Sequence, residues 1–242
     1  MTRIKSLLIS CIIASLAIST GFATPPQTSI ANMAAGTVVT RRDVDSYGAD
    51  RCFTAVSIPD DVFRRMEGKS YKRGCTVARS CLRYVRVLHY NEKKEIMIGE
   101  LVCHKSIAAD LIDIFRKLYR AKYPIERMVL IDNYGADDER SMDANNTSCF
   151  NFRQVAGSKV LSCHSMGKAI DINPRYNPHV KRDRKGNIKV SPLSGKRYAD
   201  RSRDFLFKID ATDLCYKEFI RHGFKWGGSW RSSKDYQHFE KK

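Results

Sequence analysis

The chain has 242 residues, of which 43% are hydrophobic and 10% aromatic. This composition excludes an intrinsically disordered protein, because disordered chains lack the aromatic and branched apolar residues that build a core. The length suits one packed domain, or at most two small ones. The 43 Lys and Arg residues outnumber the 26 Asp and Glu residues, which gives a formal net charge of +17.

Residues 1–23 have the pattern of a secretory signal peptide. Two basic residues precede an apolar run at 6–19, and small residues at 21 and 23 predict cleavage after Ala23. The run is shorter than the roughly 20 residues that a membrane-spanning helix needs. We therefore expect export, with no stable membrane insertion after cleavage. Lipid attachment at Cys11 is the alternative.

An exported protein of this charge is expected in the periplasm or outside the cell. Cleavage removes Arg3 and Lys5 and lowers the net charge from +17 to +15. Such a charge favours anionic partners, such as cell-wall polymers or lipid surfaces, although it can also simply keep the protein soluble. The basic residues are scattered, with one loose cluster from Lys181 to Lys189. Because no nucleic-acid-binding signature accompanies them, we do not expect nucleic acid as a partner.

Seven cysteines remain after cleavage, at positions 52, 75, 81, 103, 149, 163 and 215. Export favours disulfides, and an odd number leaves at least one thiol unpaired. No two cysteines form a C-x-x-C pair, which argues against a cysteine zinc site. Proximity alone suggests Cys75 with Cys81 and Cys149 with Cys163. Reduced, buried thiols are the alternative.

The rest of the chain is divided by composition. Residues 24–45 are small and polar without a sustained period, which predicts a flexible leader. We interpret 46–242 as a single domain, with a hairpin and helix subregion at 46–105 and a core region at 106–242.

Periodicity predicts the elements of this domain in chain order. A short helix at 60–66 is expected to be capped by an Asp and to end at Gly68. Alternation of apolar residues predicts a β-hairpin from 83–90 and 95–102. A longer helix is expected to start at the cap Ser106 and to end before Pro124.

Further elements are predicted toward the C-terminus. We expect strands at 127–131, 149–153 and 169–172, and a helix at 213–222 closed by Gly223. Hairpins and helices without regular alternation predict an α+β fold, in which helices flank an antiparallel sheet.

Two segments carry residues typical of metal chemistry, one at 162–173 and one at 223–240. Zinc in hydrolytic sites takes three protein ligands from histidines and carboxylates and leaves a fourth position open. His164, Asp171 and His238 form such a set. The glycines at 227 and 228 would permit a close backbone approach near His238.

Hydrolysis also needs a group that moves a proton and a group that stabilises negative charge. Asp235, three residues before His238, is the candidate acid/base, and burial would raise its pKa toward the working pH. Arg153 is the candidate for the developing oxyanion or a substrate carboxylate. A structural ion pair is the alternative for Arg153.

Other residues near the two segments have less specific roles. Ser162, Trp226 and Trp230 are candidate substrate-binding residues. Ser162 is expected to make local hydrogen bonds and not to be a nucleophile, since no Gly-x-Ser-x-Gly elbow surrounds it. The tryptophans form either core or a substrate wall. The remaining histidines, at 89, 104, 179 and 222, are expected to be ordinary packed or surface residues.

The pattern S-x-H-x-x-G-x-A-x-D, followed by D-x-x-H, resembles the zinc D-Ala-D-Ala carboxypeptidase/dipeptidase family. That family includes vancomycin-resistance carboxypeptidases and phage L-Ala-D-Glu endolysins, and it shares its fold with the hedgehog signalling domain. The resemblance extends more loosely from Cys52 to Glu240. It implies a hedgehog/DD-peptidase-like zinc site. The positions that match zinc ligands are His164, Asp171 and His238.

By the same resemblance, Asp235 matches the acid/base and Arg153 the transition-state arginine. Several family members have Glu where this chain has Asp235. The resemblance implies an exported zinc metallopeptidase that cuts peptidoglycan stem peptides, with D-alanyl-D-alanine carboxypeptidase as the first expectation. The alternatives are an L-Ala-D-Glu endopeptidase of the same family and a non-catalytic, zinc-containing module that binds the cell wall. A basic polyanion-binding protein without metal is a third class.

Overall fold

The larger sheet of the protein is four-stranded and antiparallel, in the order β1-β4-β3-β2. The computed structural model describes residues 29–155, 157–183 and 185–242, so the predicted signal peptide lies outside the described residues. The strands of this sheet are β1 (Val38–Val39), β2 (Thr54–Val56), β3 (Leu82–Tyr90) and β4 (Ile96–His104). β3 and β4 pair along their whole length. The predicted hairpin is confirmed.

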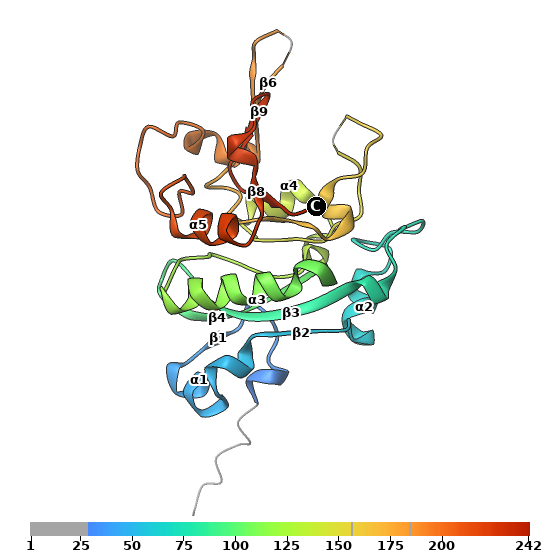
Figure 1. Ribbon diagram of the computed structural model, residues 1–242, viewed down its shortest axis with the longest axis vertical. Helices are drawn as coiled ribbons and strands as arrows, with labels where there is room; N and C mark the ends of the chain where they lie inside the picture. Colours follow the sequence, from blue (N-terminus) through green and yellow to red (C-terminus); the bar gives the residue numbers. More distant parts are fainter. Residues whose placement is uncertain (1–28, 156, 184) are drawn as a thin grey trace, which may run out of the picture.

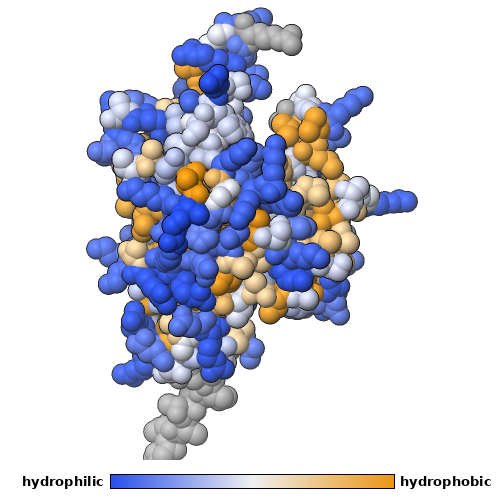
Figure 2. Space-filling model, in the orientation of Figure 1, coloured by the Kyte–Doolittle hydropathy of each residue, from blue (hydrophilic) through white to orange (hydrophobic). Residues whose placement is uncertain are grey.

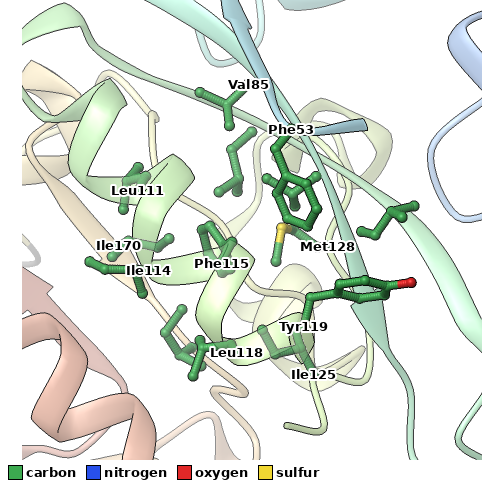
Figure 3. Packing of buried hydrophobic residues seen from close by; sticks show 14 of the residues in the cluster. Phe53, Val85, Leu111, Ile114, Phe115, Leu118, Tyr119, Ile125, Met128 and Ile170 are labelled. Atoms are coloured by element: carbon green, nitrogen blue, oxygen red, sulfur yellow. The ribbon is translucent and has the colours of Figure 1, made fainter. Parts of the chain in front are cut away.

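Helix α3 (Lys105–Arg120) lies across one face of this sheet (Figure 1). Its apolar residues recur every three or four positions and point into the core, as Figure 3 shows for Leu111, Ile114, Phe115 and Leu118. The helix was predicted, but the predicted cap Ser106 is wrong. The N-cap residue is His104, whose Nδ1 accepts a hydrogen bond from the backbone N–H of Ser106. The same core includes Ile170 and Phe239, so α3 joins the sheet to the C-terminal half.

The opposite face of the sheet is covered by the N-terminal segment (Figure 1). This segment comprises η1 (Ile30–Asn32), α1 (Arg41–Tyr47) and η2 (Ala49–Cys52). β1, which lies between η1 and α1 in the chain, is an edge strand of the sheet itself. The expected flexible leader at 24–45 is therefore wrong for its described part. A capping box between Thr40 and Asp43 starts α1, and Arg86 donates hydrogen bonds to the carbonyls of Ile30 and Met33. These polar contacts order a stretch whose composition alone looked irregular.

Two short elements lie between β2 and β3, namely α2 (Asp60–Met66) and η3 (Arg79–Cys81). α2 was predicted with these bounds, but its N-cap is Pro59, which makes no side-chain cap. Arg65 on α2 pairs with the buried Glu100 of β4, which also accepts from the hydroxyl of Tyr84. The pairing fixes α2 to the middle of β4.

The C-terminal half contains two small antiparallel sheets, in the orders β5-β10-β8 and β7-β6-β9. The first consists of β5 (Ala169–Asp171), β8 (Lys225–Trp226) and β10 (His238–Glu240). The second consists of β6 (His179–Arg182), β7 (Ile188–Ser191) and β9 (Ser233–Asp235). The helices here are α4 (Asp138–Asp143), α5 (Leu214–Arg221), η4 (Ile131–Tyr134), η5 (Cys163–Met166), η6 (Leu193–Tyr198) and η7 (Gly227–Ser229).

The strand near 169–172 and the helix at 213–222 are confirmed, and the mixture of helices and antiparallel sheets confirms the α+β class. The strands predicted at 127–131 and 149–153 are wrong. Arg127 makes an isolated bridge with Asn146, and Met128 and Phe150 each make one backbone hydrogen bond with β4, but neither segment pairs regularly enough to form a strand. The side-chain amide of Asn146 both accepts from the N–H and donates to the carbonyl of Val129. This side chain takes the place of a neighbouring strand.

The seven described cysteines are free thiols, so the two pairings suggested by proximity are absent. Four of them are buried, which matches the alternative of reduced thiols. Among the described residues, no helix combines the length and the apolar character needed to cross a bilayer.

His89 predicts a pH dependence of stability. This buried side chain on β3 donates from Nδ1 to the carbonyl of Ile125 at 2.8 Å, and burial lowers its pKa to about 4. The unfolded chain takes up this proton near pH 6.5, whereas the folded chain does not until about pH 4. Stability present above pH 6.5 is therefore lost as the pH falls, by about 2 to 3 kcal/mol at pH 4.5.

We expect His89→Asn, which keeps a donor but does not titrate, to lose less stability than wild type between pH 7.5 and pH 4.5. Urea unfolding at the two pH values measures the difference. His222→Asn, at the partly exposed end of α5, is the control and should behave as wild type. An equal loss in the His89 variant and wild type would contradict the prediction.

Candidate metal centre

Three residues from two distant segments of the chain meet where β5 and β10 pair. His164 lies in η5, Asp171 ends β5 and His238 begins β10. In the antiparallel register, His238 is directly opposite Asp171, so the two side chains lie on one face of the sheet. Phe239 and Ile170, the next pair in the register, are both buried in the core and hold the strands in place.

The spacing of the donor atoms fits a tetrahedral metal ion. Nε2 of His164 lies 3.2 Å from Nδ1 of His238 and 3.3 Å from Oδ2 of Asp171. Nδ1 of His238 lies 3.1 Å from Oδ1 of Asp171. Tetrahedral ligands about 2.0–2.1 Å from a zinc ion are about 3.3 Å from one another. The three predicted ligands therefore meet as the resemblance implied, and the donor set suits zinc.

The ring nitrogens that face away from the cluster are also bonded. Nδ1 of His164 donates to the carbonyl of Cys149 at 2.6 Å, which leaves Nε2 free to bind a metal. Nε2 of His238 lies 3.4 Å from Oε2 of Glu240, which also lies beside the thiol of Cys163. Metal-binding histidines are commonly oriented in this way by a carbonyl and a carboxylate.

The electrostatics of the cluster favour a bound cation. Although burial opposes ionisation, the two imidazoles hold the pKa of Asp171 well below its usual range. Burial also disfavours a charged His238, but Asp171 and Glu240 raise its pKa to about 10. His238 thus carries a proton in the metal-free cluster near neutral pH, and a metal ion would displace it.

Two glycines give the cluster its shape. Gly167, in the left-handed conformation with φ of 64°, ends η5, and a Cβ there would lie 2.7 Å from the backbone nitrogen of His104. At Gly227 in η7, a Cβ would lie 2.8 Å from that of Asp235 and 3.2 Å from that of His238. The absence of a side chain at Gly227 lets η7 approach His238, as expected, and the absence of one at Gly167 lets the turn after η5 lie against β4.

Asp235 lies on β9, beside the three ligands. Its Oδ1 is buried without a hydrogen-bond partner among the described residues. Burial raises the pKa of Asp235, as does the charge of Asp171, while the nearby histidines oppose the shift. A carboxyl group with a raised pKa can both accept and donate a proton, as the predicted acid/base must.

His179 is a residue of this site that the sequence interpretation missed. It lies on β6 directly opposite Asp235, and its Nε2 is likewise buried without a partner among the described residues. No motif surrounds His179, and only the register of β6 with β9 places it here. Glu240 was also missed, although its position two residues after His238 on a strand predicts a shared face.

The other candidate residues lie around the cluster. Arg153 forms an ion pair with Asp138, which is the alternative considered for it. Ser162 makes the expected local hydrogen bond, accepting from the backbone of His164. Trp230 packs near the ring of His238, with centroids 5.2 Å apart. Trp226 is a core residue whose indole N–H donates to the carbonyl of Tyr236. Because its side chain is buried, it exposes little surface that could form a substrate wall.

Two histidines and a carboxylate within reach of one ion, with a further carboxyl group beside them, form a donor set of the metallopeptidase type. Residues 156–241 match the model of a family described as D-alanyl-D-alanine carboxypeptidase. The matched segment includes His164, Asp171, Asp235 and His238 and excludes Arg153. The match confirms the predicted resemblance and identifies a peptidase region. No curated protein and no solved structure matches the chain, and the hedgehog-like fold stays a prediction.

Glu240 provides a test of this centre. Replacing it by Gln keeps the shape of the side chain but removes the carboxylate that orients His238. We expect Glu240→Gln to weaken zinc affinity by about 10- to 100-fold, the usual effect of losing such a partner. Competition with a chromogenic chelator measures the affinity. Glu92→Gln, in the exposed β3–β4 turn, is the control, and equal affinities of all three proteins would contradict the role of Glu240.

Proposed function

We propose that the protein is an exported zinc metallopeptidase that hydrolyses peptidoglycan stem peptides, as a D-alanyl-D-alanine carboxypeptidase. The observation that carries this proposal is the cluster of three side chains whose nitrogen and oxygen atoms approach one another to 3.1–3.3 Å. Beside it is Oδ1 of Asp235, which has no hydrogen-bond partner among the described residues. A zinc ion held by His164, Asp171 and His238 would supply Lewis-acid polarisation of the scissile carbonyl and lower the pKa of the attacking water. The family match supports the peptidase class.

Asp235 moves the proton in this proposal. Its ionised carboxylate takes a proton from the attacking water and then donates it to the leaving amine. The buried, unpartnered Oδ1 is free to accept that proton, because no group of the described chain competes for it. Trp230 packs near the ring of His238 and so lies beside the proposed ligands.

The oxyanion role of Arg153 is also part of the proposal. The ion pair with Asp138 holds the guanidinium, so Arg153 would have to share or exchange this partner when substrate binds. The backbone N–H of Arg153 donates to the hydroxyl oxygen of Ser165 at 2.8 Å, and this hydroxyl donates to the carbonyl of Asn151. The backbone of Arg153 is thereby tied to η5, which also carries His164.

The localisation and the substrate of the proposed enzyme fit each other. Residues 1–23 have the composition of a signal peptide, and export would bring the enzyme to its polymer. Stem peptides carry free carboxylates, and the net charge of the chain, +17 before and +15 after the proposed cleavage, attracts such anionic material. Nucleic acid is not proposed as a partner.

We expect Asp235→Asn to reduce hydrolysis of a defined stem pentapeptide by at least about 100-fold while zinc binding is retained. The amide keeps the shape of the side chain but cannot take up the proton. Products are identified by mass spectrometry, and bound zinc by elemental analysis. The exposed Asp204→Asn is the control. Full activity of Asp235→Asn would contradict the mechanism, and wall binding without any metal-dependent hydrolysis by wild type would favour the non-catalytic module.

The bond that is cut can be determined with an amidated substrate. A carboxypeptidase recognises the terminal carboxylate. We therefore expect kcat/KM for the C-terminal amide of the pentapeptide to be lower than for the free acid, by about 10-fold or more. Kinetics with the free acid and the amide measure the ratio. Equal rates would instead assign the protein as an endopeptidase, such as one that cuts L-Ala-D-Glu.

A further inference from the structure

The sheet that carries Asp235 continues outward as a hairpin of β6 and β7. The hairpin projects from the body of the C-terminal half, and its surface in Figure 2 is mainly hydrophilic (Figures 1 and 2). His179 of β6 is opposite Asp235 on one side and Ser191 of β7 on the other. Directly opposite residues of antiparallel strands share a face, so His179 and Ser191 lie on the same face as Asp235.

The next residues on this face are two lysines. Alternation along a strand places Lys181 on the same face as His179, two positions further out. Lys181 is paired with Lys189 of β7 and with Ser233 of β9. Strand residues rise about 3.3 Å each, so the lysine pair begins about 7 Å beyond Asp235, the span of about two residues of an extended peptide.

Two like charges directly opposite each other are unfavourable for the sheet unless something offsets them. Both lysines are exposed, and among the residues described neither ammonium group forms a salt bridge. The nearby acid is Asp183, which lies close enough to Lys189 to interact with it electrostatically. Its carboxylate is already occupied by the backbone N–H groups of Lys185 and Asn187 and by the side-chain amide of Asn187. The pair therefore lacks a dedicated counter-ion.

We propose that Lys181 and Lys189, next to His179, form a subsite that binds a carboxylate of the peptide substrate. Lys181 and Lys189 are directly opposite each other on neighbouring strands and share one face of the sheet, and a carboxylate has two oxygens to share between two ammonium groups. His179, whose Nε2 has no hydrogen-bond partner among the described residues, is level with Asp235 and two positions before Lys181 on the same face, so it adjoins both Asp235 and the lysine pair. This inference rests on the proposed function, because it assigns the lysines to the same substrate.

Stem peptides offer two carboxylates of this kind, the C-terminal one and the α-carboxylate of D-Glu that is linked through its γ-carboxyl. The test uses the pentapeptide L-Ala-γ-D-Glu-L-Lys-D-Ala-D-Ala and two derivatives, in which either the C-terminal or the D-Glu carboxylate is an amide. Binding to metal-free protein is measured by calorimetry, so that hydrolysis does not interfere. The recognised carboxylate is the one whose amidation makes the Kd of the peptide the same for wild type and for a variant that lacks the two lysines.

We expect the double variant Lys181→Gln/Lys189→Gln to raise the Kd of the pentapeptide by about five- to tenfold, as two exposed ion pairs would. The Kd of the peptide that lacks the recognised carboxylate should be the same for the double variant and wild type. Salt should weaken binding of the pentapeptide to wild type more than to the double variant. Lys234→Gln is the matched control, because Lys234 lies on β9 next to Asp235 but on the opposite face.

An unchanged Kd in the double variant would overturn the proposal. An equal loss of affinity for all three peptides in the double variant would also overturn it, as would an equal loss of affinity in Lys234→Gln. Either result would show only a general effect of charge. The proposed function fails separately, if the zinc-loaded wild type does not hydrolyse the pentapeptide. Lysine-dependent binding to the metal-free protein would then still support the subsite, whereas hydrolysis with lysine-independent binding overturns the subsite alone.

Discussion

The pairing of β5 with β10 is the constraint on which the site depends. Only this register places His238 opposite Asp171, and the residues are separated by 67 positions in the chain. The register is fixed by burial, because Ile170 and Phe239 are completely enclosed in the core. A shift by one residue would turn Phe239 toward the open site and His238 into the core. The hydrophobic core therefore sets the geometry of the metal centre.

The centre concentrates charge where the protein is least able to solvate it. His164, Asp171 and His238 are all largely enclosed, and burial of charged groups is costly unless partners offset it. The partners are supplied at each outer edge, by the carbonyl of Cys149 and by the carboxylate of Glu240. The remaining ring nitrogens of the two histidines and the carboxylate of Asp171 face one another. The chain is thus arranged to hold a cation, and its neighbouring groups are already fixed in the orientation that a cation requires.

The sequence was most informative where one period dominates. The β3–β4 hairpin and α3 follow from unbroken alternation and from an apolar stripe, and the three candidate ligands follow from a motif with fixed spacing. It was least informative where side chains replace regular backbone pairing, as Asn146 does beside Val129. Such a contact joins residues whose local sequence gives no sign of it. The same holds for His179, which reaches the site through strand register alone.

Cys149 connects the interior of the protein to the metal centre in a direct way. Its carbonyl orients His164, and its thiol donates to the carbonyl of Gly167 at 3.6 Å, within the turn that follows His164. Both contacts are buried. A fluctuation that exposes this sulfur to solvent must separate the segment from η5 and release the imidazole at the same time. Integrity of the interior and competence for metal binding are consequently lost together, as one cooperative event.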